Sequence, residues 1–100
     1  MNIPTKNSQK PKHVFTLYIS GMSPHSVAAV KNLKKICDQY LLGQYEIKTI
    51  DLVLEPEKAE TDHIFATPTL IKRLPLPARK VIGDLSNTKQ VLIHLDIQQD

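Results

Sequence analysis

The sequence predicts a single mixed α/β domain, and three observations lead to this fold class. Residues 14–19 form a nearly continuous run of apolar, β-favouring side chains, as expected of a strand covered on both faces. An amphipathic helix follows, and a second strand begins at Tyr45, after a crossover long enough for a right-handed βαβ unit with parallel strands. Pro68 stands at the entrance of a later strand, where its missing N–H costs the sheet no hydrogen bond.

The composition limits the kind of protein. With 100 residues, 41% of them hydrophobic and 23% charged, the chain has room for one core and one principal site or interface. Thirteen basic and ten acidic residues are spread along the chain and only 5% of residues are aromatic, so we do not expect nucleic-acid binding. No apolar run approaches the ~20 residues that span a bilayer, and the single cysteine forms no internal disulfide, so we expect a cytoplasmic protein that does not bind membranes.

The first half of the chain contains clear boundary signals. Residues 1–12 lack apolar periodicity and are predicted to be a flexible leader before a single domain over residues 13–100. Ser23 and Pro24 are typical of a helix N-cap and first helical position, and Gly43 is typical of a helix end. Between them, apolar side chains at spacings of three and four predict the buried face of the helix: Val27, Val30, Leu33, Cys37, Tyr40 and Leu41.

The next elements are shorter. A strand is predicted over residues 45–53, and the charged residues 57–63 favour a marginal helix that depends on tertiary contacts because its apolar face is poor. Residues 67–74 predict another strand, the Pro-Leu-Pro sequence after it predicts a rigid turn, and residues 79–82 predict a paired strand that ends at Gly83. The order is therefore strand, helix, strand, helix, strand, strand before the C-terminal segment.

The C-terminal segment, residues 87–97, contains two conflicting patterns. Alternating apolar residues are typical of a strand: Val91, Ile93, Leu95 and Ile97. A capping-box resemblance and an apolar stripe are typical of a helix: Asn87 with Gln90, then Val91, Leu92 and Leu95. Such a conflict indicates either that one of the patterns assigns the wrong structure to the segment, or that the segment has two functional states.

The chain lacks the residues that common chemistries require. The turn at residues 21–25 contains no cysteine, which excludes thiol–disulfide exchange of the two-cysteine kind. Cys37 is expected to be a small core residue, with a single-cysteine redox sensor as the alternative. The histidines lack the spacing of a metal site, and the isolated glycines form no phosphate-binding loop. We therefore expect no cofactor and no enzymatic activity.

Charged side chains remain as candidates for recognition, in three groups. The first surrounds the predicted second helix: Glu55, Glu57, Lys58, Glu60 and Asp62. Glu46 and Lys48 lie on the predicted second strand, at an edge of the sheet. Arg79 and Lys80 follow the rigid turn, which presents their basic surface with little loss of ordering entropy.

Several of these segments occur together in one family. Residues Ala66-Thr67-Pro68-Thr69-Leu70 and Ile82-Gly83-Asp84-Leu85-Ser86-Asn87, with the glycine turn and the Ser-Pro helix start before them, resemble the KaiB family of bacterial clock proteins. The resemblance covers about residues 13–97. It implies a thioredoxin-like βαβαββα fold in the partner-binding form, and an alternative βαββααβ ground-state topology in a tetramer.

The resemblance also implies a function. Members of this family are non-enzymatic regulators that bind the N-terminal ATPase ring of the hexameric KaiC and modulate its phosphorylation state and signalling. KaiA, or a thioredoxin-like histidine-kinase sensor domain, is the implied third partner, and the stored form self-associates as a dimer or tetramer. We expect the charged stretch from Glu55 to Asp62 to bind KaiC, and Glu46 and Lys48 to face the third partner. The expected conformational switch residues are Pro68, Pro75, Pro77, His94 and Asp96.

Two positions depart from the family pattern. His94 stands where the family usually has glycine, which removes backbone freedom. Glu46 stands where a small apolar residue is common, which argues against KaiA capture and favours a system of KaiC without KaiA. A stress-response adaptor that acts on a histidine kinase is a further alternative.

Overall fold

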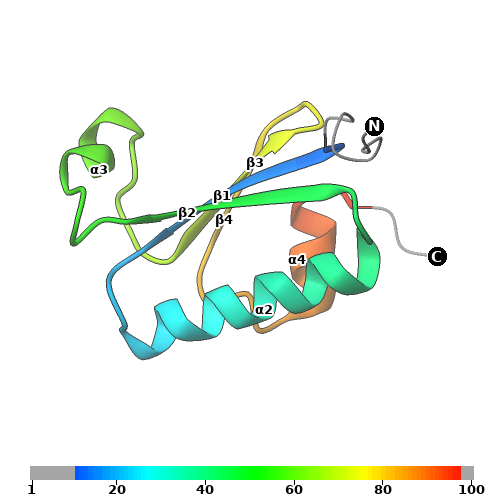
Figure 1. Cartoon of the computed structure of the whole chain (residues 1–100), viewed down its shortest axis with the longest axis horizontal. Coiled ribbons are helices and arrows are strands. Elements are labelled where there is room, and N and C mark those ends of the chain that lie inside the picture. Colours follow the sequence, from blue (N-terminus) through cyan, green and yellow to red (C-terminus); the bar gives the residue numbers. More distant parts are fainter. Residues whose placement is uncertain (1–10, 98–100) are drawn as a thin grey trace, which may run out of the picture.

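Seven elements make up the computed structural model, which describes residues 11–97 (Figure 1). In chain order they are β1 (His13–Ile19), α2 (Pro24–Tyr40), β2 (Tyr45–Asp51), α3 (Glu57–Thr61), β3 (Thr69–Leu74), β4 (Arg79–Ile82) and α4 (Thr88–His94). This is the predicted βαβαββα order. Residues 1–10 of the predicted leader and residues 98–100 of the predicted domain lie outside the described residues.

The strands form one mixed sheet in the order β2-β1-β3-β4. β1 and β2 are parallel, as predicted, whereas β1 pairs with β3, and β3 with β4, in antiparallel orientation. The carboxyl ends of β1 and β2 therefore lie beside the start of β3, and the loops that follow them gather at the end of the sheet where α3 projects (Figure 1). We call this the α3 end of the sheet.

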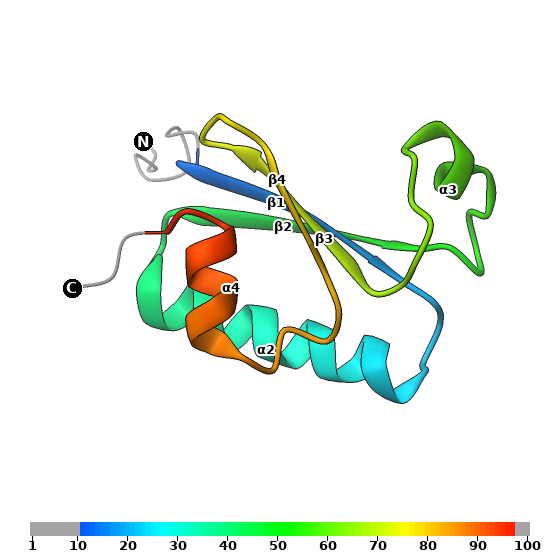
Figure 2. The ribbon, with the colours of Figure 1, turned by 180° about the vertical axis from the view of Figure 1, so that it is seen from behind.

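Helices α2 and α4 pack on one face of the sheet, which we call the covered face (Figure 2). The start of α2 is fixed locally, because Ser23 Oγ accepts a hydrogen bond from the N–H of Ser26 at 3.3 Å and Pro24 follows the cap. The core on this face joins both helices to the sheet and consists of Phe15, Leu17, Ala29, Leu33, Ile36, Cys37, Leu41, Leu70, Leu85, Val91, Leu92, Leu95 and Ile97.

The first turns of α2 correct the predicted buried face. Val27 and Val30 were expected in the core, but they are 37% and 41% exposed. Ser26 and Ala29 face the sheet instead. Ser26 is held there because its Oγ accepts a hydrogen bond from the N–H of Ser20 at 3.0 Å, so a small polar residue occupies the place expected for valine.

One carboxylate connects the two turns that follow the parallel strands. β2 ends at Asp51, two residues before the predicted end, because residues 52–54 form a turn. Asp51 Oδ1 accepts a hydrogen bond from the N–H of Val53 at 2.9 Å within this turn. It also accepts one from the N–H of Gly21 at 3.0 Å, in the turn between β1 and α2. A single side chain thus joins the β1–α2 and β2–α3 turns.

Two other boundaries differ from the prediction by two residues. α3 ends at Thr61, because His63 adopts a left-handed conformation with φ of 58° that a helix cannot continue through. β3 begins at Thr69, after a cis peptide bond between Thr67 and Pro68. β4 has the predicted bounds.

The C-terminal segment is helical in this structure. Asn87 Oδ1 accepts a hydrogen bond from the N–H of Gln90 at 3.2 Å, as the capping signal indicated. Val91, Leu92 and Leu95 enter the core, whereas Ile93 is 56% exposed. The helical stripe therefore prevails over the alternating pattern in this packing.

The opposite face of the sheet, which we call the open face, has a smaller core. Four buried residues form it, from β1, β2, β3 and the loop after α3: Tyr18, Ile50, Ile64 and Ile71. Within the described residues no helix lies across this face, and α3 stands only at its end (Figures 1 and 2).

Candidate interaction surfaces

The charged stretch predicted for KaiC binding lies on and beside α3. This helix contains no buried residue, and Glu55, Glu57 and Glu60 are exposed, whereas Lys58 is partly covered. Asp62 differs from the others, because it also has a structural contact with the sheet. Glu57, Lys58 and Glu60 thus lie on α3, which projects from one end of the sheet (Figure 1), and Glu55 and Asp62 flank it.

Asp62 is the end of a hydrogen-bond chain across the open face. The Tyr18 hydroxyl donates to Asp62 Oδ2 at 2.7 Å and accepts from Arg73 Nη2 at 2.7 Å. Arg73 Nε donates in turn to Thr16 Oγ1 at 3.1 Å. Burial raises the pKa of Tyr18 to about 12, and the hydrogen bond from Tyr18 lowers the pKa of Asp62. We call this chain, Thr16–Arg73–Tyr18–Asp62, the open-face relay.

Sequence reasoning missed the relay. Its members are up to 57 residues apart in the chain, so no local spacing connects them. The available signal was the pair of polar atoms at Thr16 and Tyr18, two residues apart on one face of an otherwise apolar strand. Buried hydroxyls need partners, which indicated a polar group above this strand.

The relay lies in a groove that joins two predicted sites. The groove has a volume of about 290 Å³. Glu46 and Lys48 of the β2 edge line it together with Lys58 and Asp62. The remaining lining residues are Val14, Thr16, Tyr18, Ile50, Arg73 and Leu74. The predicted third-partner edge and the predicted KaiC-binding segment are therefore neighbours, which the sequence did not reveal.

The predicted basic surface lies on the other edge of the sheet. Arg79 and Lys80 are exposed on β4, and Lys80 Nζ donates a hydrogen bond to the carbonyl oxygen of His63 at 3.4 Å. This contact places Lys80 near the segment that follows α3, away from Glu46 and Lys48 on the β2 edge.

The predicted switch residues are divided between the two ends of the sheet. Pro68 is buried at the start of β3, whereas Pro75 and Pro77 are exposed in the turn between β3 and β4. His94 is exposed at the end of α4, and Asp96 follows with φ of 59°. They do not form one cluster, and their switching role stays a prediction.

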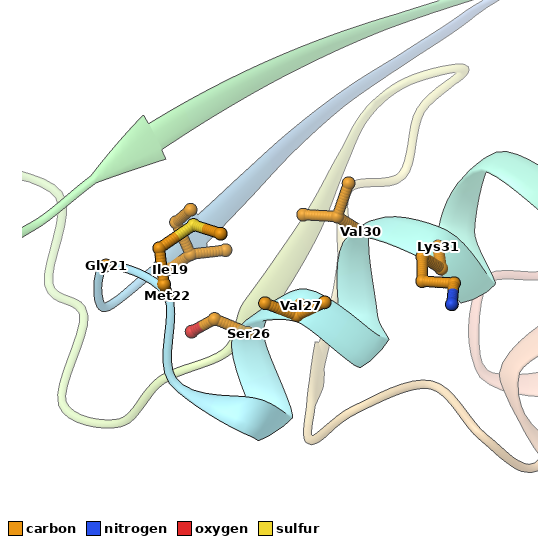
Figure 3. Close-up of a pocket in the computed structure, with 7 residues that line it drawn as sticks. All are labelled: Ile19, Gly21, Met22, Ser26, Val27, Val30 and Lys31. Atoms are coloured by element: carbon orange, nitrogen blue, oxygen red, sulfur yellow. The ribbon is translucent and has the colours of Figure 1, made fainter.

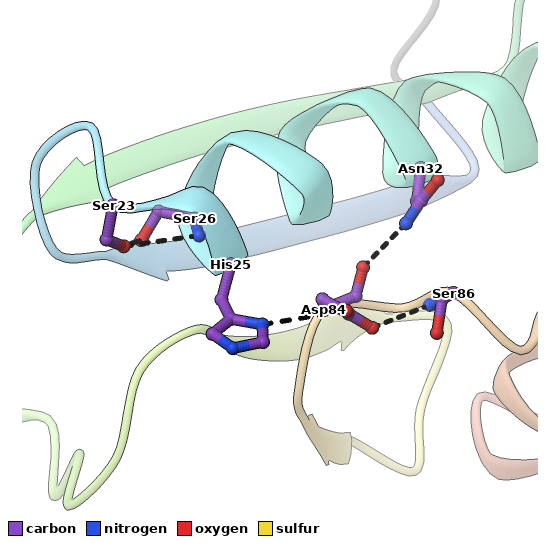
Figure 4. A network of polar contacts seen from close by, with 6 residues as sticks. All are labelled: Ser23, His25, Ser26, Asn32, Asp84 and Ser86. Atoms are coloured by element: carbon purple, nitrogen blue, oxygen red, sulfur yellow. Dashed lines mark hydrogen bonds and ion pairs between the residues drawn. The ribbon is translucent and has the colours of Figure 1, made fainter.

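A polar network attaches the loop before α4 to α2 (Figure 4). Asn32 Nδ2 donates to the carbonyl oxygen of Asp84 at 2.8 Å, and His25 Nδ1 lies 3.6 Å from Asp84 Oδ2. The N–H of Ser86 donates to Asp84 Oδ1 at 3.0 Å. The Ser86 hydrogen bonds are the main cause of the lowered pKa of Asp84, with a smaller contribution from His25. Leu85, between them, is buried at φ of 63°.

An apolar cavity of about 170 Å³ lies beside the turn between β1 and α2 (Figure 3). Its lining residues are Ile19, Gly21, Met22, Ser26, Val27, Val30 and Lys31. The two valines that were expected in the core thus face this cavity. Met22 is 85% exposed at its rim.

The only cysteine does not have the features of a reactive thiol. Cys37 is fully buried among the apolar residues of the covered face, as predicted, and burial raises its pKa to about 12. This environment disfavours the redox-sensor alternative. Over residues 11–97, no group of three His, Cys, Asp or Glu side chains could hold a metal ion.

Among the helices of residues 11–97, none has both the length and the apolar character that a membrane crossing requires.

Comparisons with solved structures define the fold class. The structure is similar to the N-terminal domain of SasA from Synechococcus elongatus, with a TM-score of 0.69 and 20% identity, covering 100% of this chain and 97% of that one. It is also similar to mitochondrial thioredoxin 3 from Saccharomyces cerevisiae, with a TM-score of 0.66 and 15% identity, covering 86% and 78% of the two chains. The protein therefore has a thioredoxin-like fold.

Sequence comparisons then define the family. The model of the KaiB domain matches residues 16–97. The circadian clock oscillator protein KaiB of Gloeothece citriformis is 49% identical over 94% of this chain and 89% of that protein. KaiB1 of Synechocystis is 50% identical over 91% of this chain and 87% of that protein. This chain belongs to the KaiB family.

Proposed function

We propose that this protein is a non-enzymatic, clock-type regulator in the cytoplasm that binds the N-terminal ATPase ring of a KaiC-like hexamer. Binding modulates the phosphorylation state and signalling of that hexamer. The observation that carries the proposal is the exposed α3, in which a structured turn without buried residues presents several carboxylates at one end of the sheet. Membership of a family whose curated relatives are named as clock oscillator proteins supports it.

The proposed mechanism is a population shift. A βαββααβ form stored in a dimer or tetramer hides the binding surface, and the ring selects the thioredoxin-like form described above. The apparent affinity is then the intrinsic affinity reduced by the fraction of competent protein. The conflicting patterns in residues 87–97 support this mechanism, because the same residues suit a strand and a helix. Amide NMR tests it, since one unexchanging topology with and without the ring would contradict the shift.

A third partner is proposed for the β2 edge. Glu46 and Lys48 are exposed on an edge strand, where an added strand can pair with the backbone. KaiA or a thioredoxin-like histidine-kinase domain is the candidate. A histidine-kinase domain has a second proposed role, which is to compete with this protein for one ring surface, and the fold shared with the SasA N-terminal domain supports that role. Glu46 favours a system in which KaiA is absent.

Charge reversal on α3 tests the proposed binding face. Glu57→Lys and Glu60→Lys should each weaken binding to an immobilised KaiC homologue, by about tenfold, because a like charge then faces the partner. Asp38→Lys makes the same change of charge on α2, far from α3 in the chain, and should leave the affinity unchanged. Interferometry gives the affinities, and size-exclusion chromatography gives the oligomeric state. If Glu57→Lys and Glu60→Lys bind the KaiC homologue as tightly as the unmodified protein does, the assigned face is wrong.

A further inference from the structure

The position of α3 has to be set from outside the helix. It has five residues, and a helix of this length is not stable by itself in water. None of its side chains is buried, so no apolar stripe attaches it to the sheet. Within residues 11–97, the chain around α3 contacts the open face through the buried side chain of Ile64 and the hydrogen bond from Tyr18 to Asp62. A longer hydrogen bond of 3.4 Å joins Lys80 of the β4 edge to the carbonyl oxygen of His63.

The Tyr18 contact is the directional one of the two. Ile64 packs into a small apolar cluster, and apolar packing restricts distance more than orientation. For residues 57–62, the bond between Tyr18 and Asp62 is the one side-chain hydrogen bond to a strand that the structure describes. It joins Asp62, the C-cap residue of α3, to β1, which lies between β2 and β3 in the sheet.

The phenol of Tyr18 is itself held in one orientation. Its side chain is fully buried, its hydroxyl hydrogen is given to Asp62, and its oxygen accepts from Arg73. Arg73 is fixed in turn by its bond to Thr16. Arg73 is an exposed residue, but two of its donors are engaged, so the guanidinium restricts the position of the Tyr18 hydroxyl.

We propose that Tyr18, held by Arg73, is a positioning residue that fixes the acidic face of α3 before a partner binds. This inference rests on the proposed binding of a KaiC-like ring through α3. Tyr18 is fully buried in the free protein, so its effect on binding is transmitted through Asp62. Its contribution is pre-organisation, because an α3 that is already ordered loses less entropy on docking.

The test uses another tyrosine–aspartate pair among the described residues as its control. The hydroxyl of Tyr45 donates to Asp38, on α2 and away from α3. Tyr18→Phe and Tyr45→Phe each delete one hydroxyl that serves one carboxylate. In hydrogen exchange on the free protein, Tyr18→Phe should accelerate the amides of residues 57–63 by roughly five- to tenfold, the value of one lost hydrogen bond. Tyr45→Phe should leave those amides unchanged.

Ring binding provides the second measurement. Tyr18→Phe should weaken the affinity for a KaiC homologue by about three- to tenfold, and Tyr45→Phe should not. Arg73→Met, which keeps the apolar stem and removes the donors, should produce a smaller change in the same direction. The free energy of unfolding in urea is measured for each variant as well, so that a local effect on α3 can be separated from a loss of global stability.

The combined results support or overturn the positioning role of Tyr18. Faster exchange confined to residues 57–63, together with weaker binding, supports the proposal. Unchanged exchange in Tyr18→Phe, acceleration across the whole sheet, or faster exchange of α3 with full affinity would each overturn it. If the unmodified protein does not bind the ring, the proposed function is wrong and the role in binding is withdrawn with it, while the exchange result alone decides whether Tyr18 orders α3.

Discussion

The two faces of the sheet are organised by different interactions. On the covered face, a cluster of thirteen buried apolar residues connects α2 and α4 to the strands. On the open face, four buried apolar residues are accompanied by the open-face relay. Apolar packing depends on area and tolerates small rearrangements, whereas a hydrogen-bond chain depends on individual atoms. The covered face should therefore determine global stability, and the open face should determine the local geometry of α3.

The largest expected difference is in core truncation. Leu33→Ala on the covered face should cost several kcal/mol, near the upper end of the range of about 2–5 kcal/mol for such changes, because the well-packed surroundings cannot collapse. Ile64→Ala on the open face should lie near the lower end, since its small cluster can relax. Urea denaturation measures both. Equal losses of unfolding free energy in the two variants would contradict the proposed difference between the faces.

Alkaline pH should remove a stabilising contribution of the open face. The pKa of Tyr18 is raised to about 12 from a usual value of 10, so the folded state favours the protonated phenol. This contribution, of the order of 2 kcal/mol, is fully present below pH 10 and is lost as the pH rises from 10 towards 12.

The comparison with Tyr18→Phe isolates that contribution. The variant has no ionisable group at this position, so its stability should fall less over the same pH interval. Cys37, whose pKa is also raised, is present in both proteins, so its contribution cancels in the difference. Parallel pH curves for the two proteins would contradict a buried, hydrogen-bonded Tyr18.

Acidic pH should act on the network that attaches the loop before α4. The pKa of Asp84 is lowered, so its contribution is present above the unfolded value of 3.8 and is lost as the pH falls through the folded value. Ser86→Ala should raise the pKa of Asp84 towards normal, as carboxyl NMR shifts would report. An unchanged pKa in this variant would mean that the side-chain hydroxyl of Ser86 does not contribute.

The smallest effect is expected at the exposed pair beside β2. Lys34 Nζ lies 2.7 Å from Asp38 Oδ2, and the solvated pair raises the pKa of Lys34 through that hydrogen bond. Lys34→Ala should not change the urea midpoint measurably, because solvent screens such pairs. A clear decrease of the urea midpoint would show that this exposed ion pair stabilises the fold as strongly as the buried residues do.

Local signals predicted much of this fold, and contacts between distant residues explain the rest. Ser23 and Pro24 mark the start of α2 because a cap acts over three residues. Val27 and Val30 were misplaced because the bond between Ser20 and Ser26 sets the rotation of the helix. In residues 87–97 two periodicities coincide, so packing against the covered face, not the pattern, selects the helix.

The candidate site was predicted in composition but not in arrangement. The charged residues on α3 and on the β2 edge were identified because charged side chains in such segments indicate solvent-exposed positions. Their meeting in one groove depends on Tyr18 and Asp62, which are 44 residues apart. No spacing rule encodes such a contact, since strand order decides which distant segments become neighbours.

The carboxylate of Asp51 has a consequence for how the surface of this protein can vary. Surface loops usually accept insertions and deletions independently of one another. Here one oxygen accepts the N–H of Gly21 and that of Val53, so lengthening either loop would withdraw support from the other. The two loops should therefore change together over evolution, as one unit of fixed length.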